Sequence, residues 1–289
     1  MRTLIAPTEM SGRPGRFIYR FVLVSTLVGF TLAFVFPLYW MATGALKSSR
    51  ELADPNPTVW PESWHPETYS EAWSNVGLGH HFLNTLILAA GAWLLQLIVA
   101  TSAAYALSAL RPVLGNVVLA MMLATLMLPV TALLVPSYLT VTDVPLLHLN
   151  LINTPWAIWL PASANAFNVF ILKRFFDQIP TELIEAARID GAGPLRTLLL
   201  VVLPLSRPVL AVVSIFAVVG VWKDFLWPLL VLPDSARQPI TVALLRLSEF
   251  MSANQLLAGM VMASIPLLVL FLIFQRHIVA GLTAGSLKG

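Results

Sequence analysis

Charge is scarce in this sequence. Only 17 Lys and Arg residues and 14 Asp and Glu residues occur among 289, so charged residues make up 11% of the chain and hydrophobic residues 58%. A soluble domain carries about 25% charged residues, because its surface must face water. The shortage excludes a water-soluble globular protein and predicts an integral membrane protein. The net charge of +3 is too small to indicate a nucleic-acid partner.

Cysteine is absent, which excludes disulfides, thiolate metal sites and cysteine nucleophiles. The five histidines do not have the spacing of metal ligands, so we predict that the chain itself binds neither a metal nor a cofactor. The alternating apolar pattern of barrel strands is also missing. The expected fold is therefore an all-α membrane protein.

Long apolar stretches are what the sequence has in place of charge. A helix needs about 20 residues to cross a bilayer. Five charge-free stretches exceed that length, and a sixth is interrupted by Arg207, Lys223 and Asp224. We predict one transmembrane domain, residues 1–289, with six spans near residues 17–46, 82–110, 113–140, 155–172, 205–232 and 250–275. Prolines inside these spans predict kinks, at Pro129, Pro136, Pro161, Pro228 and Pro266.

The positive charges predict the orientation. Six spans place both termini on one side, and 12 of the 17 Lys and Arg residues fall on that side, against 4 on the other. Both termini are therefore expected in the cytoplasm. The outer loop, residues 47–80, mixes four prolines with tryptophan and tyrosine, which predicts irregular backbone near the lipid headgroups. This loop serves either as a docking surface or as a plain connector.

The cytoplasmic loop of residues 173–207 carries nine charged residues and a helical pattern. Thr181 is the predicted N-cap of a short helix that ends at Gly191. Gly193 and Pro194 begin a second short helix, which leads into the fifth span. The first helix is too short to cross the bilayer, so we expect it to lie along the cytoplasmic surface.

The surface of this short helix suits a protein contact. The small side chains of Ala186 and Ala187 would let another surface approach closely, and Glu185 offers a carboxylate to a basic group across the contact. An interfacial helix without a partner is the alternative.

The spacing within this loop resembles the EAA loop of permease subunits of bacterial ABC importers, through Glu185, Ala186, Ala187, Gly191, Val201, Leu203 and Pro204. Residues 225–230 resemble the fifth-span signature of the carbohydrate branch of that family. Residues 275–285 resemble the C-terminus of the second, maltose-type permease of the branch. The resemblance extends from about residue 17 to residue 289.

The resemblance implies a six-helix permease subunit of a binding-protein-dependent importer in the bacterial inner membrane. Such a subunit forms half of the pathway for a sugar or sugar derivative, in a heterodimer with a second, homologous permease. The other implied partners are a dimer of ATP-binding subunits, which hold ATP and Mg, an extracytoplasmic solute-binding protein and membrane lipid. The chain itself has no phosphate-binding glycine loop, so it is not expected to be an enzyme.

The resemblance also implies which residues contact the ATPase. In the family, the EAA helix sits in a cleft of the ATP-binding subunit, which implies coupling roles for Glu185, Ala186, Ala187, Asp190, Gly191, Leu203 and Pro204. By likeness to the maltose-type permease, the C-terminal tail reaches the ATPase dimer interface through Gly281, Thr283, Gly285 and Lys288. A frayed C-terminus is the alternative for that tail.

Lys223 and Asp224 lie inside the predicted fifth span, where ionised groups are costly and line water, a partner or a pathway. Together with Trp222 and Trp227, whose aromatic faces suit sugar rings, they are the predicted substrate pathway. The alternative is that the charges reach the outer headgroups and the tryptophans act as interfacial anchors. The family has Asn where this chain has Lys223. A cation at this position either favours an anionic substrate, such as a glycerol phosphate, or pairs with an acidic residue of the partner permease.

Two other classes of protein compete with this interpretation. A membrane-embedded enzyme needs a constellation of acid, base or nucleophile, and one Lys beside one Asp does not supply it. An ion-driven secondary transporter predicts inverted repeats and several intramembrane acids, of which Asp224 alone is present.

Overall fold

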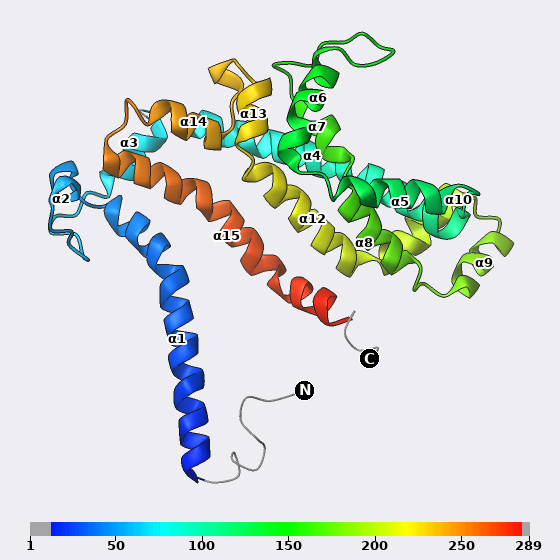
Figure 1. Ribbon diagram of the computed structural model, residues 1–289, viewed down its shortest axis with the longest axis horizontal. Helices are drawn as coiled ribbons and strands as arrows, with labels where there is room; N and C mark the ends of the chain where they lie inside the picture. The colour runs from blue at the N-terminus through cyan, green and yellow to red at the C-terminus, as the bar shows by residue number, and fades with distance from the viewer. Residues whose placement is uncertain (1–12, 75, 285–289) are drawn as a thin grey trace. The chain divides into compact units, whose positions relative to one another are not determined.

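The computed structural model describes residues 13–74 and 76–284, with the backbone alone for residues 13–15 and 276–284. The described residues form helices joined by loops, and the only β pairing among them is an isolated bridge between Val144 and Leu149 (Figure 1). This confirms the helical fold class. The chain divides into two compact units, Met1–Asn75 with Phe250–Val261 and Val76–Glu249 with Met262–Gly289.

The first unit is built on one long helix, α1 (Arg13–Gly44). Its large apolar side chains are exposed along most of its length, as expected of a helix that meets lipid or another chain. Two short helices follow, α2 (Ser49–Ala53) and α3 (Glu67–Ser74), and the start of α15 (Ala253–Ala284) completes the unit. The outer loop is thus partly helical.

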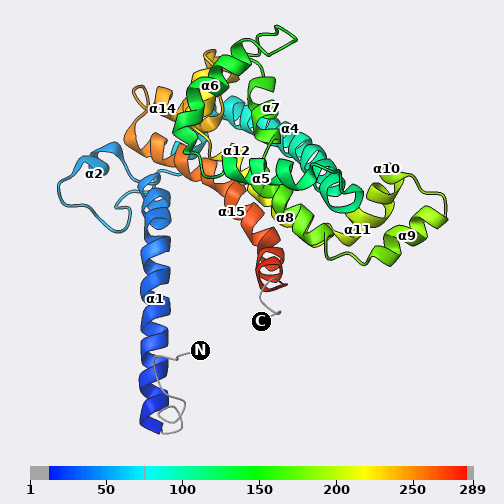
Figure 2. The same ribbon diagram turned by 45° about the vertical axis from the view of Figure 1, so that its right-hand side comes forward.

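The second unit is centred on α4 (Leu78–Tyr105), which continues as a π-helix, η2 (Ala106–Leu110). The most extensive packing against α4 is by α7 (Trp156–Ser163), α8 (Ala166–Phe176) and α12 (Arg207–Trp222) (Figure 2). The remaining elements are α5 (Gly115–Thr125), α6 (Val130–Thr142), α9 (Thr181–Ile189), α10 (Pro194–Thr197), η3 (Leu198–Val202), α11 (Leu203–Leu205), α13 (Leu226–Val231), η4 (Ser235–Arg237) and α14 (Ile240–Leu247).

The apolar core of this unit lies where α4, α8, η3 and α12 meet. It is made of Ala100, Ala104, Tyr105, Val169, Leu172, Phe176, Ile179, Leu198, Val202, Val209 and Val213. Small residues on α4 allow the close approach of its neighbours. The tightest is at Gly91, where a Cβ atom would lie 2.2 Å from the Trp159 ring on α7.

Three helices among the described residues are long and apolar enough to cross a membrane, at Arg16–Gly44, Leu78–Leu110 and Ala253–Gln275. Two bent pairs qualify if each pair counts as one span, α5 with α6 at 110° and Pro194–Leu205 with α12 at 88°. The protein therefore passes through the membrane several times. The predicted fourth span, residues 155–172, is divided between α7 and α8, so the number of six stays a prediction.

Prolines explain where predicted spans break. Pro129 cannot donate a hydrogen bond to the carbonyl of Thr125, and α5 ends at Thr125, which confirms the predicted kink. Within residues 205–232 the helix ends at Trp222 and begins again at Leu226. Pro228 likewise cannot donate to the carbonyl of Asp224, which accepts instead from Thr241 Oγ1 at 2.9 Å. Each of these two predicted spans is therefore divided between separate helices.

Candidate functional site

Glu185, Ala186 and Ala187, the first residues of the EAA resemblance, lie in the short helix α9 (Thr181–Ile189). This helix begins one residue before the predicted position. Pro180 is the N-cap, with an extended ψ of 130°, and Thr181 already lies inside the helix without a capping hydrogen bond. The predicted N-cap was therefore wrong by one residue. Glu182 lies in the first turn, where the positive end of the helix dipole stabilises a carboxylate.

The end of α9 is set by Gly191, as predicted. Gly191 has a φ of +78°, which favours glycine. Its N–H donates to the carbonyl of Arg188 at 3.0 Å, and the N–H of Ala192 donates to the carbonyl of Ala187 at 2.9 Å. These two bonds form a Schellman motif, which turns the chain away from the helix axis. Gly193 then caps α10, whose first residue is Pro194.

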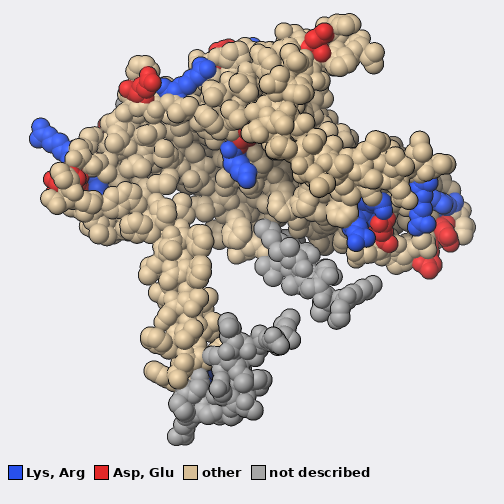
Figure 3. Space-filling model, viewed as in Figure 1, with Lys and Arg blue, Asp and Glu red and all other residues tan. Residues whose placement is uncertain are grey.

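Three of the seven predicted coupling residues lie on one exposed helix, and two more follow its end. Glu185 and Ala186 are exposed on α9 and Ala187 is half-buried, while Asp190, its exposed C-cap, and Gly191 come directly after it. Charged side chains of both signs gather over α9 and the adjoining ends of α8 and α10, as Figure 3 shows. Leu203 and Pro204 do not lie on this helix, because they belong to α11, beyond η3.

Two buried residues anchor the base of α9 in the core. Phe176, the last residue of α8, and Ile179, just before α9, lie in the cluster that contains Leu198 and Val202 of η3. A displacement of α9 therefore bears directly on the helices packed around this cluster. Next to the anchor, Glu185 lines a groove of about 190 Å³.

A larger cavity, of about 340 Å³, lies among α4, α6, α7 and α12. Its lining includes Gln96, Ser137, Asn165, Phe216, Asp224 and Trp227. Asp224 is the only charged residue in the described lining, and the other polar groups are two amides and a hydroxyl. This combination of apolar walls and a few convergent polar groups is typical of a small-molecule site.

The four predicted pathway residues separate in space. Asp224 and Trp227 line the cavity, and Trp227 Nε1 donates to the carbonyl of Ala157 at 2.9 Å. Trp222 is buried instead, where its Nε1 donates to the carbonyl of Ala263 at 3.0 Å and its ring meets Phe82 edge to face. Lys223 is exposed and does not belong to the lining.

Three polar residues of the cavity were missed by sequence reasoning. Gln96 is only 3% exposed, and it was overlooked inside a long apolar stretch. Asn165 caps α8 at the break after α7, where its Oδ1 accepts from the N–H of Asn168 at 3.0 Å. A polar amide at that break was the available signal. Ser137, near Pro136, carried no distinguishing pattern.

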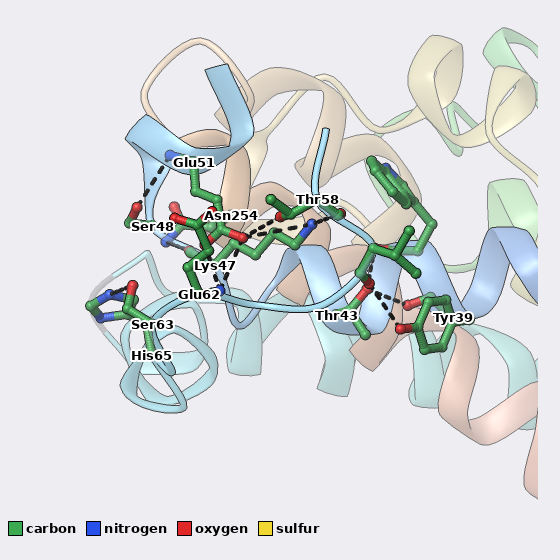
Figure 4. A network of polar contacts seen from close by, with 12 residues as sticks. Tyr39, Thr43, Lys47, Ser48, Glu51, Thr58, Glu62, Ser63, His65 and Asn254 are labelled. Carbon is green, nitrogen blue, oxygen red and sulfur yellow. Dashed lines mark hydrogen bonds and ion pairs between the residues drawn. The ribbon is translucent and has the colours of Figure 1, made fainter. Parts of the chain in front are cut away.

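The outer loop of the first unit is held by a buried lysine. Lys47 is 2% exposed, and its Nζ donates to the carbonyl of Thr58, lies 3.9 Å from Glu51 Oε1 and stands 4.7 Å from the centre of the Trp40 ring (Figure 4). Its carbonyl accepts from Asn254 Nδ2 at 3.1 Å. The loop is therefore ordered around this group, whichever of its two predicted roles it serves.

The predicted tail contacts fall at the end of the chain. Gly281 and Thr283 lie in the last turns of α15, where the backbone alone is described, and Gly285 and Lys288 lie outside the described residues. No cluster of three or more His, Asp or Glu residues suited to a metal occurs in the described parts of the chain.

Comparison with known proteins adds to this geometry. The family model of "Binding-protein-dependent transport system inner membrane component" matches residues 96–283. The probable ABC transporter permease protein YurM of Bacillus subtilis is 31% identical over 264 residues, which are 90% of this chain and 86% of YurM. The melibiose/raffinose/stachyose import permease protein MelC of the same organism is 33% identical over 262 residues, covering 88% of this chain and 91% of MelC.

One further relative and one solved structure extend the comparison. The sn-glycerol-3-phosphate transport system permease protein UgpE of Rhizobium meliloti is 33% identical over 259 residues, covering 86% of this chain and 90% of UgpE. A chain in the crystal structure of a bacterial ABC transporter involved in the import of the acidic polysaccharide alginate has a TM-score of 0.81. At 23% identity, with 92% of this chain and 98% of that chain covered, this likeness establishes a common fold.

Proposed function

Because this chain belongs to the family of binding-protein-dependent transport system inner membrane components, we propose that it forms half of an import pathway for an uncharged sugar or sugar derivative. Members of the family are permease subunits, and a separate ATPase hydrolyses ATP. The chain is accordingly not an enzyme. Family membership also leaves no support for an ion-driven secondary transporter.

The charge of the cavity carries the proposal for an uncharged substrate. Asp224 lines it and Lys223 does not, so an anionic substrate would meet a carboxylate without a compensating cation from this chain. The amides of Gln96 and Asn165 can donate to and accept from sugar hydroxyls. The ring of Trp227 offers an apolar face of the kind that a pyranose ring packs against. The relative named for melibiose, raffinose and stachyose is consistent with this chemistry.

The number and orientation of the spans, the partner subunits and the contact with the ATPase belong to the same proposal. The long apolar stretches predict six spans in one domain, and the distribution of positive charge predicts that both termini lie in the cytoplasm. The implied partners are a second permease, a dimer of ATP-binding subunits that hold ATP and Mg, and an extracytoplasmic solute-binding protein. The exposed helix α9 would fit the ATPase through Glu185, Ala186, Ala187 and Asp190, with Gly191 setting its end and Leu203 and Pro204 joining it to α12.

An uptake assay of the complete importer tests the substrate class. Labelled raffinose and labelled sn-glycerol-3-phosphate serve as the uncharged and anionic probes. We expect ATP-dependent uptake of raffinose, a loss of at least tenfold in Asp224→Asn, where about 1.4 kcal/mol corresponds to tenfold, and little change in Lys223→Asn. Uptake of sn-glycerol-3-phosphate alone, abolished by Lys223→Asn, would contradict the proposal and support an anionic substrate.

The coupling role of α9 has its own test. Glu185→Lys reverses a charge on the exposed face, so we expect uptake to be lost together with co-purification of the ATP-binding subunit. Glu182→Lys is the matched control, because Glu182 is exposed on the first turn of the same helix. Normal uptake in Glu185→Lys would remove the coupling assignment.

A further inference from the structure

The carboxylate of Asp177 joins two segments that lie far apart in the sequence. Its Oδ1 accepts a hydrogen bond from Ser108 Oγ at 2.8 Å, and its Oδ2 accepts from Lys173 Nζ at 2.8 Å. Ser108 is 6% exposed, and the side chains of Lys173 and Asp177 are 16% and 32% exposed. Both carboxylate oxygens are thus occupied at a partly buried position, where charge-assisted hydrogen bonds are stronger than at the surface.

Each partner of Asp177 comes from a different part of the bundle. Asp177 is the C-cap of α8 and stands only three residues before Pro180, the N-cap of α9. Lys173 lies one turn earlier on α8. Ser108 lies in η2, the π-helix that ends α4. Asp177 therefore stands at the joint where the chain leaves α8 for α9, and it ties that joint to the end of α4.

The backbone at the far side of this link is held in an uncommon conformation. Arg111 has a φ of +46°, and its N–H donates to the carbonyl of Ala106 at 3.0 Å, which closes the π-helical turn. Its Nε donates to the carbonyl of Ser108 at 3.0 Å. A π-helical turn and a left-handed non-glycine residue cost free energy, so the contacts around them must hold them in place. Ser108 is presented to Asp177 by this turn.

The groove beside α9 places the hydrogen bond between Ser108 and Asp177 next to the exposed residues of α9. Ser108, Arg111 and Asp177 line it together with Glu185 and Arg188 of α9. A movement of α9 toward or away from this groove changes the geometry at Asp177 directly. Phe176 and Ile179 hold the connection between α8 and α9 against the apolar core. Apolar packing is not directional, whereas the hydrogen bonds of Asp177 require particular angles, so they restrict the orientation of this connection.

We infer that Asp177 is a positioning residue that fixes the direction in which α9 leaves α8, and that it does so through Ser108 and Lys173. This inference rests on the proposed function, because it concerns the transmission of ATPase movement from α9 to α4. With the link intact, α9, the end of α8 and the end of α4 move together. Without it, α9 can turn about the joint while the spans stay where they are, so that ATP is hydrolysed with little transport.

The test measures substrate transported per ATP hydrolysed, in the complete importer reconstituted into proteoliposomes with its solute-binding protein. We expect Asp177→Ala and Ser108→Ala to assemble with the ATP-binding subunit in normal amount and to lower that ratio, by about tenfold for the loss of the charged group. A structural defect alone would lower assembled complex and both activities together, without changing the ratio. The control is Asp143→Asn, which removes an exposed carboxylate that pairs with His148 in the α6–α7 connection.

A charge exchange strengthens the test. The pair Lys173→Asp with Asp177→Lys restores the ion pair one helical turn apart and returns a hydrogen-bonding partner to Ser108. We expect this double variant to recover a substantial part of the ratio that each single variant loses. An unchanged ratio in Asp177→Ala, or no recovery in the exchanged pair, would overturn the inference. Failure of the proposed function is seen separately, as an absence of ATP-driven uptake in the wild-type importer.

Discussion

Trp227 donates from Nε1 to the carbonyl of Ala157 at 2.9 Å. That carbonyl is free to accept because the residue four positions later is Pro161, which has no N–H to donate to it within α7. A proline in one helix thus supplies the acceptor that positions a tryptophan of another. Both Trp227 and Pro161 line the cavity, so this relationship shapes the wall of the proposed pathway.

Trp227→Phe tests this relationship. We expect the apparent melting temperature of the purified complex to fall, by an amount that corresponds to about 1 kcal/mol for one lost hydrogen bond. Trp156→Phe is the control, since Trp156 is 47% exposed on the same helix as Ala157. In a Pro161→Ala background the new N–H competes for the carbonyl, so the cost of Trp227→Phe should shrink. Equal costs in both backgrounds would show that the carbonyl is not freed by the proline.

Gly191→Ala tests the end of α9. No atom lies within 4 Å of the Cβ position, so the change acts through the backbone alone, at a φ of +78°. We expect uptake to fall because the strain, about 1 kcal/mol, alters the direction of the chain after α9. Gly193→Ala is a close control, since that glycine also has open space but a φ of −68°. Equal uptake in the two variants would argue against a conformational role for Gly191.

Gly91→Ala tests the contact between α4 and α7. The new methyl group would lie 2.2 to 2.5 Å from three atoms of the Trp159 indole, whose Nε1 is held by the carbonyl of Leu88 at 3.0 Å. Overpacking of this kind costs about 1–3 kcal/mol, so we expect a clear drop in the apparent melting temperature. Gly29→Ala, with nothing within 4 Å of its Cβ position, should leave that temperature nearly unchanged.

Lys47→Met tests the outer loop. It leaves Glu51 buried without its cation, and the loss of one partner from a buried ion pair costs about 3–5 kcal/mol. We expect the loop to become sensitive to protease in intact vesicles. Arg50→Met removes an exposed charge three residues away and should have no such effect. If Lys47→Met stays as resistant as the wild type, Lys47 does not order the loop.

Local signals accounted for the parts of the structure that depend on neighbouring residues. Gly191 ends α9 and Gly193 with Pro194 begins α10, as predicted, because both features follow from the backbone preferences of the residues themselves. The break at Pro129 follows from its missing N–H. The resemblance to importer permeases is confirmed by the family match over residues 96–283.

Other features depend on helices that meet across the bundle. Trp222 and Trp227 are five residues apart, and the sequence offered no reason to separate them, yet one is buried against Phe82 and the other lines a cavity. The helix is broken between Trp222 and Leu226, so the regular spacing of a single helix does not relate the two tryptophans. Lys223 and Asp224 are likewise adjacent, and only Asp224 belongs to the cavity.

The sequence by itself determined that this is a helical membrane protein, where the short helix α9 ends and to which family it belongs. These follow from composition, from glycine and proline, and from the spacing of a few residues along a short loop. Only the tertiary structure decided that Gln96, Asn165 and Asp224 share one cavity and that Ser108 meets Asp177. Such contacts join residues on different helices, and their formation depends on how side chains pack across the bundle rather than on any local preference.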